Sequence, residues 1–313
     1  MSTRPTLAEG LVVSVHGRHC VVETADGTRR ICHPRGKKST AVVGDRVAWL
    51  PALPGQGEEG TIEKLLPRRN LFYRQDEIRT KSFAANLDQV LILIAAEPEF
   101  SEVQLSRALI AAEAERITPL IVLNKSDLAE PFHRAWGWLA PYRAMGYNIL
   151  PLSLKQDEAS VAALSAALAG KTTLVLGPSG SGKSTLINRL VPGALAATGE
   201  ISQALNSGKH TTTTTSWYWV EQDVDKPATA LIDSPGFQEF GLHHVDARHL
   251  ADFMPDFKRH IAQCKFYNCT HLHEPGCGVR AAIETGADEE RISARRYKIY
   301  GDLFEELSQG PRY

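Results

Sequence analysis

The sequence predicts a multi-domain protein with an OB-like β-barrel at residues 1–66, a central α/β domain at 67–241 and a mostly helical metal-binding domain at 242–313. Three observations support this division. Short strands separated by turn residues fill the N-terminal part, and apolar strands alternate with helices in the middle. Three of the five cysteines fall within fourteen residues near the C-terminus. A chain of 313 residues is long enough for two or three domains.

The N-terminal part alternates apolar and polar residues in short segments. These segments read LVVSVHGRHCVVET, TRRICHP, DRVAWL and EEGTIEKLL, and turn residues separate them. Several short strands in under sixty residues are typical of an OB or SH3-like barrel, with a fragment of a β-sandwich as the alternative. Residues 67–81, which begin with Pro-Arg-Arg-Asn, are expected to form a linker.

The central part shows continuous apolar strands that alternate with helical segments. Such strands are typical of a parallel sheet that helices cover on both faces. Ser101 stands where its side chain can cap the first helix. The expected strands are 89–96, 119–125, 147–153 and 172–177, and the expected helices are 101–116, 131–145 and 159–168.

A phosphate-binding loop follows the fourth of these strands. It fits the pattern G-x4-G-K-[ST], with a β-branched strand before it and a helix after it. Its glycines allow backbone N–H groups to curl round phosphates, Lys183 would neutralise phosphate charge, and Ser184 would bind Mg²⁺. The expected phosphate-site residues are Gly177, Pro178, Ser179, Gly180, Ser181, Gly182, Lys183, Ser184 and Thr185.

An N-K-x-D motif at the end of the second expected strand, residues 124–127, predicts which base is bound. The Asp127 carboxylate can accept both the N1–H and the N2 amino proton of guanine, a pair of donors that adenine lacks. A site built on such a pair strongly rejects the analogue without it. Asn124 and Lys125 would orient the loop around the base, so GTP and GDP are the expected ligands.

An Asp-x-Pro-Gly segment, residues 233–236, follows another apolar strand, TALID. A GTPase places there an aspartate near Mg²⁺ and a glycine N–H near the γ-phosphate, which are the roles expected of Asp233 and Gly236. Five threonines in a row, 211–215, precede this segment. Thr212 or Thr213 is expected to close over Mg²⁺ when GTP is bound, with an ordinary β-strand as the alternative.

The order of these motifs is reversed, because the base-reading motif precedes the phosphate loop by about fifty residues. This order predicts a circularly permuted GTPase domain whose cut lies just after Asp-x-Pro-Gly. Such a permutation changes the connectivity and leaves the strands in place. Ser153 follows a strand between the two motifs and is expected to lie beside the base, since α/β sheets bind ligands at the carboxyl ends of strands.

The C-terminal cysteines lie in the pattern Cys264-x4-Cys269-x-His271-x5-Cys277. Three sulfurs and one imidazole complete a tetrahedral Zn²⁺ site with no open position, so one structural zinc ion is expected. It would hold together a small domain that buries little core. His273 is a second candidate for the nitrogen ligand, and reduced cysteines without metal are the alternative.

Charge and hydropathy limit the partners. The longest clean apolar run, 90–96, is too short to span a bilayer, and the N-terminus has no apolar signal core, so a cytoplasmic protein is expected.

The net charge is −1, but residues 1–81 carry 14 Lys/Arg against 9 Asp/Glu. This basic part could contact nucleic-acid phosphates or be merely a solvated surface. The expected phosphate contacts are Arg29, Arg30, Arg35, Lys37 and Lys38.

The combination of a small barrel, the motifs NKSD, GPSGSGKS and DSPG in that order, and the Cys₃His cluster resembles a known family. The whole chain is similar to the ribosome small-subunit-dependent GTPase A family, the circularly permuted YjeQ-type GTPases. The resemblance implies an OB-fold barrel and GTP hydrolysis stimulated by the small ribosomal subunit. It further implies binding to that subunit and its 16S rRNA, and a role in its late maturation. No membrane partner is expected, and nothing indicates an obligate oligomer, so a monomer is expected.

Phe237 stands where many GTPases carry a water-orienting glutamine. A phenyl ring cannot orient water by hydrogen bonding, so intrinsic hydrolysis is expected to be slow. His210, beside the threonine run, is the candidate to orient water once a partner orders its loop, and a His merely exposed on a mobile loop is the alternative.

Two other functions fit parts of the sequence. A P-loop kinase for a small metabolite would prefer ATP, and the N-K-x-D motif counts against it. An RNA-binding module that acts independently of GTP would not need Lys183, Ser184 or Asp233. All three residues are present, which counts against this alternative.

Overall fold

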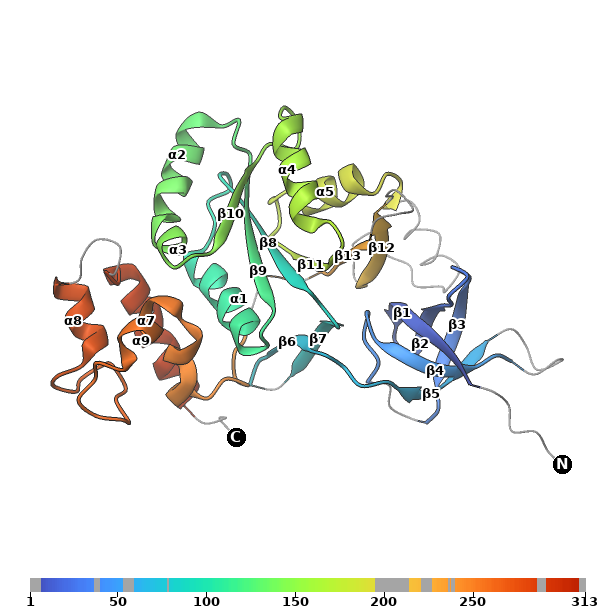
Figure 1. Ribbon diagram of the computed structural model, residues 1–313, viewed down its shortest axis with the longest axis horizontal. Coiled ribbons are helices and arrows are strands. Elements are labelled where there is room, and N and C mark those ends of the chain that lie inside the picture. The colour runs from blue at the N-terminus through green and yellow to red at the C-terminus, as the bar shows by residue number, and fades with distance from the viewer. Residues whose placement is uncertain are drawn as a thin grey trace.

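The computed structural model describes residues 7–36, 40–52, 59–77, 79–194, 214–220, 227–235, 237, 240–285 and 291–309. Figure 1 shows three parts: a β-barrel near the N-terminus, a central sheet between helices, and a group of helices that ends the chain. The predicted fold class, an OB-like barrel, an α/β domain and a mostly helical C-terminal domain, is confirmed.

The barrel contains five strands, and the first and fourth strands close it by pairing with each other. Its interior is apolar, and Cys20 and Cys32 lie there opposite each other on neighbouring strands, both fully buried. They therefore occupy core positions, as small apolar side chains do. The strands are β1 (Ala8–His16), β2 (His19–Glu23), β3 (Arg29–Pro34), β4 (Arg46–Leu50) and β5 (Gly60–Leu65).

The central sheet has the order β10-β9-β8-β11-β13-β12, with β12 antiparallel to its neighbour and the other five strands parallel. Each parallel strand is apolar on both faces, because helices cover both sides. The strands are β8 (Gln89–Ala95), β9 (Thr118–Asn124), β10 (Asn148–Leu152), β11 (Thr172–Leu176), β12 (Ser216–Val220) and β13 (Thr229–Asp233).

Helices α1 to α3 pack on one face of this sheet, and α4 and α5 pack on the other. Ser101 caps α1 as expected, since its side chain accepts a hydrogen bond from the Gln104 N–H. The helix expected over 131–145 is divided at Leu139, and Pro141 stands in the first turn of the second piece, where it needs no helical N–H bond. The helices are α1 (Glu102–Ala114), α2 (Ala129–Trp138), α3 (Ala140–Ala144), α4 (Glu158–Leu168) and α5 (Lys183–Leu190).

Residues 67–81 were expected to be a linker, and this expectation is wrong for most of them. The chain forms an antiparallel hairpin there, with strands β6 (Leu71–Gln75) and β7 (Thr80–Ala85). Phe72 and Phe83 are almost fully buried on one face of the hairpin. Their burial stabilises strands whose other residues are largely polar, which is why local composition indicated a linker.

The barrel and the central sheet are joined edge to edge. Strand β1 pairs with β12 at Ser14 and Ser216, so both parts form one eleven-stranded sheet. The Trp219 indole N–H also donates to a Glu23 carboxylate oxygen at 2.6 Å. The barrel therefore contacts the strand that leaves the threonine run.

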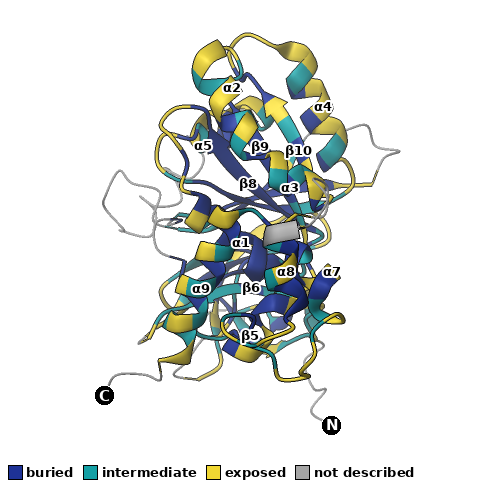
Figure 2. Ribbon diagram, turned by 90° about the vertical axis from the view of Figure 1, so that its left-hand side faces the viewer, coloured by how far each residue is buried: buried dark blue, intermediate teal, exposed yellow. Residues whose placement is uncertain are grey.

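The C-terminal part packs against α1 and α3 through a buried cation. The Arg296 guanidinium lies between Asp256, at 2.9 Å, and the Ser106 hydroxyl on α1, at 2.7 Å. Figure 2 shows that the helices of the C-terminal part combine buried and exposed residues. The elements are the 3₁₀ helix η1 (Ala247–Phe253), α7 (Pro255–Ile261), α8 (Gly278–Thr285) and α9 (Ala294–Ser308).

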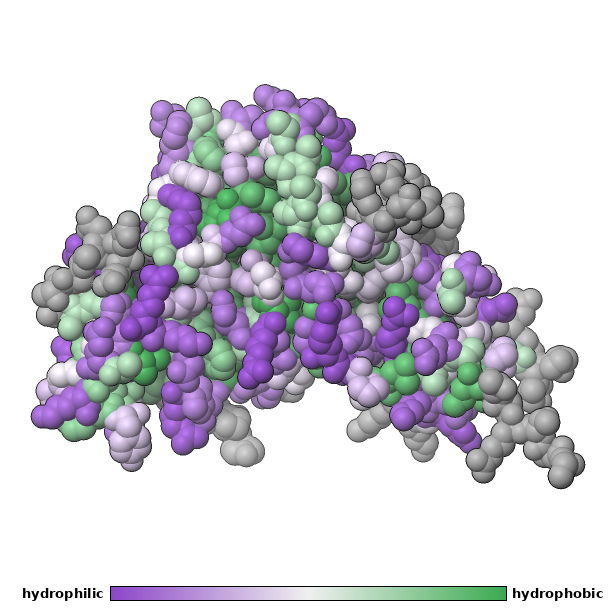
Figure 3. Space-filling model, viewed as in Figure 1, coloured by the Kyte–Doolittle hydropathy of each residue, from purple (hydrophilic) through white to green (hydrophobic). Residues whose placement is uncertain are grey.

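Among the described residues, no helix combines the length and apolar character needed to cross a membrane. On the face that Figure 3 shows, hydrophilic side chains surround separate hydrophobic areas.

Candidate nucleotide site and metal centre

The expected nucleotide motifs meet at one edge of the central sheet. Strands β9, β11 and β13 are parallel, so their carboxyl ends lie together, and each ends at one of the motifs. A cavity of about 830 Å³ opens there. It is lined by Asn124, Lys125, Asp127, Leu128, Leu154, Lys155, Gly177, Pro178, Ser179, Gly180, Gly182, Lys183, Ser184, Thr185, Pro235 and Phe237.

The phosphate loop is shaped by glycine. Gly182 has a φ of +99°, in the left-handed region, and a Cβ atom there would lie 2.4 Å from the Asn124 side-chain nitrogen. Only glycine therefore fits between the two loops. Helix α5 begins at the next residue, and no side chain in the described part of the chain caps it. Its first backbone N–H groups are available to phosphate oxygens.

Lys183 and Asp233 form an ion pair beneath this loop. Asp233 is fully buried, and its Oδ2 atom has no hydrogen-bond partner in the described part of the chain. A buried carboxylate oxygen without a partner is costly. A hard cation such as Mg²⁺ is a fitting ligand for it, together with the Ser184 hydroxyl on the cavity wall. The residues present thus suit a nucleoside triphosphate with its magnesium ion.

Hydrogen bonds join the base-reading loop to the phosphate loop and to the loop that follows β10. The Asn124 amide donates to the Ser181 carbonyl oxygen at 2.9 Å. The Ser153 hydroxyl donates to an Asp127 carboxylate oxygen at 2.8 Å. Ser153 is 2% exposed and is absent from the cavity wall, so in this structure it orients Asp127 instead of facing the cavity itself. Lys125 donates to the Glu97 carbonyl oxygen.

Four of the expected site residues, His210, Thr212, Thr213 and Gly236, lie outside the described residues. The nearest described part of the threonine run is close to the Asp-x-Pro-Gly segment, since the Thr215 and Ser234 hydroxyls are 3.2 Å apart. Pro235 of the Asp-x-Pro-Gly segment lines the cavity, and so does Leu128, which carries no signal in the sequence because its place depends on how the strands meet.

The C-terminal cysteines and one histidine converge on a second site. The ligand atoms of Cys264, Cys269, His271 and Cys277 all lie within 4.8 Å of one another. The His271 Nδ1 atom is 3.5 Å from both the Cys264 and the Cys277 sulfur. His273 is exposed and does not belong to this cluster. Three sulfurs and one imidazole around one point suit Zn²⁺.

Helix α9 supports the loop that carries these ligands. The Tyr297 hydroxyl donates to the His271 carbonyl at 2.8 Å, and the Tyr300 hydroxyl donates to the Thr270 carbonyl at 2.7 Å. The Glu274 carboxylate accepts from the Thr270 N–H at 2.9 Å. The loop geometry is therefore fixed by protein contacts as well as by its candidate metal ligands.

The fold and the cavity define a class of protein. A base-reading loop that precedes its phosphate loop in the chain, but faces the same cavity, is the arrangement of a circularly permuted P-loop GTPase. A model of the RsgA GTPase family matches residues 65–243. The chain belongs to this family and is a GTPase.

Relatives resemble the chain over nearly its whole length. It is 70% identical over 304 residues to the small ribosomal subunit biogenesis GTPase RsgA of Variovorax paradoxus, covering 97% of this chain and 93% of the relative. It is 50% identical to the protein of the same name from Paraburkholderia phytofirmans, covering 97% and 95%.

Solved structures agree with these matches. YjeQ from Thermotoga maritima superposes with a TM-score of 0.72 at 29% identity, covering 96% of this chain and 99% of that one. The structure titled YloQ, a circularly permuted GTPase, gives 0.70 at 26% identity, covering 100% and 99%. The family resemblance, fold class and GTPase activity predicted from the sequence are confirmed, and the individual site residues stay predictions.

Proposed function

We propose that this GTPase binds the small ribosomal subunit and hydrolyses GTP, stimulated by that subunit, during the subunit's late maturation. The observation that carries the proposal is the 70% identity, over nearly the whole chain, to a protein named for small-subunit biogenesis. The proposed partner includes 16S rRNA. The proposal also includes a cytoplasmic monomer with one structural zinc ion.

The cavity residues have distinct roles in this proposal. Asp127, oriented by Ser153, selects guanine, while Lys183 and the N-terminus of α5 hold the phosphates. Ser184 and Asp233 hold Mg²⁺, which when bound neutralises negative charge on the phosphates. Lys183 is paired with Asp233 in this structure, so its charge is already positioned at the phosphate end of the cavity.

Orientation of the attacking water is assigned to His210. Phe237 lines the cavity and is 4% exposed, and its ring offers no hydrogen bond to water. The test is His210→Ala with His249→Ala, an exposed histidine of the C-terminal part, as the matched control. We expect partner-stimulated turnover to fall about 100-fold or more in His210→Ala alone, as for loss of a general base. Full stimulated turnover in His210→Ala would remove this assignment.

The barrel is the proposed contact for rRNA phosphates. Arg29 is paired with Glu23 at 2.8 Å and Arg35 with Glu63 at 2.5 Å, whereas Arg30 is exposed and forms no ion pair with another described residue. Lys37 and Lys38 lie outside the described residues. Arg30→Gln is therefore expected to weaken subunit binding and to lower the slope of log K against log salt by about one.

The deciding experiment is steady-state GTP hydrolysis with and without purified small subunits at fixed salt, with large subunits as the control. Strong stimulation by small subunits alone supports the proposal. Slow hydrolysis that small subunits leave unchanged would keep the GTPase and remove the ribosomal partner. Light scattering of the isolated chain tests the proposed monomer.

A further inference from the structure

The β6–β7 hairpin lies between the barrel and the Asp-x-Pro-Gly segment. On the barrel side, the Ala85 N–H donates to the Val43 carbonyl at 2.9 Å. Gly44 there is packed so closely that a Cβ atom would lie 2.2 Å from the Ala85 carbonyl oxygen. On the other side, the Gln75 N–H donates to the Gly241 carbonyl at 3.1 Å, just beyond the Asp-x-Pro-Gly segment.

The apolar face of the hairpin packs on the chain that follows Asp-x-Pro-Gly. The centroid of the Phe240 ring lies 5.5 Å from that of Phe72 and 5.8 Å from that of Phe83. The Phe240 ring also packs near Phe237, which lines the nucleotide cavity. All four rings are buried. Buried aromatic contacts of this kind hold the two segments in one arrangement.

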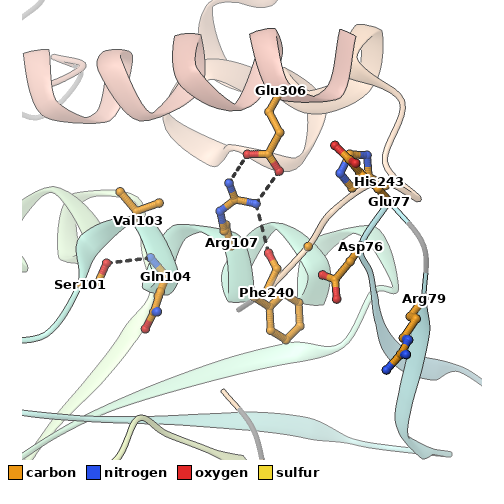
Figure 4. A pocket seen from close by; sticks show the side chains of 11 residues that line it. Asp76, Glu77, Arg79, Ser101, Val103, Gln104, Arg107, Phe240, His243 and Glu306 are labelled. Atoms are coloured by element: carbon orange, nitrogen blue, oxygen red, sulfur yellow. Dashed lines mark hydrogen bonds and ion pairs between the residues drawn. The ribbon is translucent and has the colours of Figure 1, made fainter. Parts of the chain in front are cut away.

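Phe240, at the end of the segment that begins after Asp233, is held by a second contact. Figure 4 shows that Arg107 of α1 donates to the Phe240 carbonyl oxygen, at 3.2 Å, and to the carboxylate of Glu306 on α9. The segment is thus fixed at Phe240 by α1 and α9. Its beginning, next to Asp233, depends on a different contact.

That contact comes from Lys81 on β7. Its ammonium donates to the Pro235 carbonyl oxygen at 2.8 Å and lies 5.2 Å from the centre of the Phe83 ring. Lys81 is half-buried and faces Arg74 on the paired strand. Burial and the nearby Arg74 charge lower the pKa of Lys81. The ammonium therefore has a neighbouring cation that repels it and a carbonyl oxygen that holds it.

We propose that Lys81 is a positioning residue for GTP hydrolysis, which acts by holding the Pro235 carbonyl and thereby the chain that leaves Asp233. A peptide unit is planar, so fixing its carbonyl oxygen also fixes the direction of its N–H. The Pro235 carbonyl shares its peptide unit with the N–H of Gly236, which the Asp-x-Pro-Gly motif predicts to lie near the γ-phosphate. Lys81 itself is absent from the wall of the nucleotide cavity, so its effect is on turnover and not on nucleotide affinity.

The inference rests on the GTPase activity and not on the ribosomal partner. It is tested on the full chain with Lys81→Met, Lys81→Arg and, as matched control, Arg79→Met, which removes an exposed cation from the same hairpin. Basal kcat and KM for GTP and the affinity for GDP are measured for each variant, with the melting temperature as a check of folding.

We expect kcat of Lys81→Met to fall about tenfold or more with KM within about twofold, because displacing a reacting group by about 1 Å can cost up to about 100-fold. Lys81→Arg keeps a cation that can reach the carbonyl and is expected to restore at least half of kcat. Arg79→Met is expected to match the wild type.

Three results would overturn the proposal. They are a kcat for Lys81→Met within twofold of the wild type, a raised KM at unchanged kcat, and Lys81→Arg no better than Lys81→Met when both melt like the wild type. If Lys81→Met melts early, Lys81→Gln compared with Lys81→Arg decides in the same way. Because the readout is basal turnover, a wild type that small subunits fail to stimulate would remove the ribosomal proposal and leave this test intact.

Discussion

The side-chain amide of Asn124 donates a hydrogen bond to the Ser181 carbonyl oxygen across 2.9 Å, and both residues are buried. This bond joins the base-reading loop after β9 to the phosphate loop before α5, two segments whose order in the chain is reversed. The two loops form one site in spite of the permuted order, because each follows a parallel strand and the carboxyl ends of these strands lie together.

Asn124→Ala is expected to weaken GDP binding about tenfold or more, because the Ser181 carbonyl is left buried without its partner, at a cost of about 1–3 kcal/mol. Fluorescence titration with a labelled GDP measures the change. Asn148→Ala, an exposed asparagine on the same sheet, is the control and is expected to bind as the wild type does. Equal affinities of the two variants would contradict the role assigned to Asn124.

Asp127→Asn is expected to lower GTP affinity by about 10⁴-fold, because a site built for the two guanine donors loses its acceptor. The amide of the variant can donate to the C2 carbonyl of xanthine, so xanthosine triphosphate is expected to restore hydrolysis. Turnover with both nucleotides, measured for wild type and variant, checks this. Failure of the xanthine nucleotide to bind would argue against Asp127 as the base reader.

His271→Ala is expected to abolish stoichiometric zinc binding, whereas His273→Ala is expected to retain one zinc ion per chain. The reason is that, of these two histidines, His271 places a ring nitrogen among the three sulfurs and His273 does not. Metal analysis of the purified variants gives the answer, and far-UV circular dichroism with a chelator shows whether the C-terminal helices depend on the ion. The opposite result would assign the nitrogen ligand to His273.

Arg296→Met is expected to destabilise the protein by about 3–5 kcal/mol, because it leaves the Asp256 carboxylate buried and unpaired. Arg295→Met is the neighbouring control. The Arg295 side chain is 59% exposed, so the loss of its pair with Glu102 is expected to cost less than the loss of the buried cation. Urea unfolding of both variants compares the two values, and similar losses would show that the buried cation is not what joins the C-terminal part to α1.

His244 predicts a dependence of stability on pH. Burial, with a smaller effect of His243, lowers its pKa from 6.5 to about 4. The unfolded chain therefore takes up a proton at a higher pH than the folded chain does. Its contribution to stability is fully present above about pH 6.5 and is lost as the pH falls towards 4.

The variant His244→Phe keeps an aromatic ring against Tyr73 and has no titrating group there. We expect its free energy of unfolding to fall less than that of the wild type between pH 7.5 and pH 5, measured by urea unfolding. Parallel curves for the two proteins would show that His244 is not responsible.

Much of this protein was determined by local sequence. The strands of the central sheet are apolar throughout and were predicted within a residue or two. The barrel strands alternate and were also located, except that the segment LVVSVHGRHCVVET forms two strands, β1 and β2. The phosphate loop, the base-reading motif and the Cys₃His cluster have fixed spacings, since each needs particular residue types at particular positions around one ligand.

Other features were decided only by tertiary structure. The β6–β7 hairpin is polar in sequence, and two buried phenylalanine rings make it a structural element. The choice of His271 over His273 depended on which ring turns inward. Lys81 carries no motif, and its contact with Pro235 joins residues 154 positions apart. Local sequence patterns indicate which residues of a helix or strand are buried and how ligand residues are spaced. Contacts between distant segments depend instead on how whole elements pack.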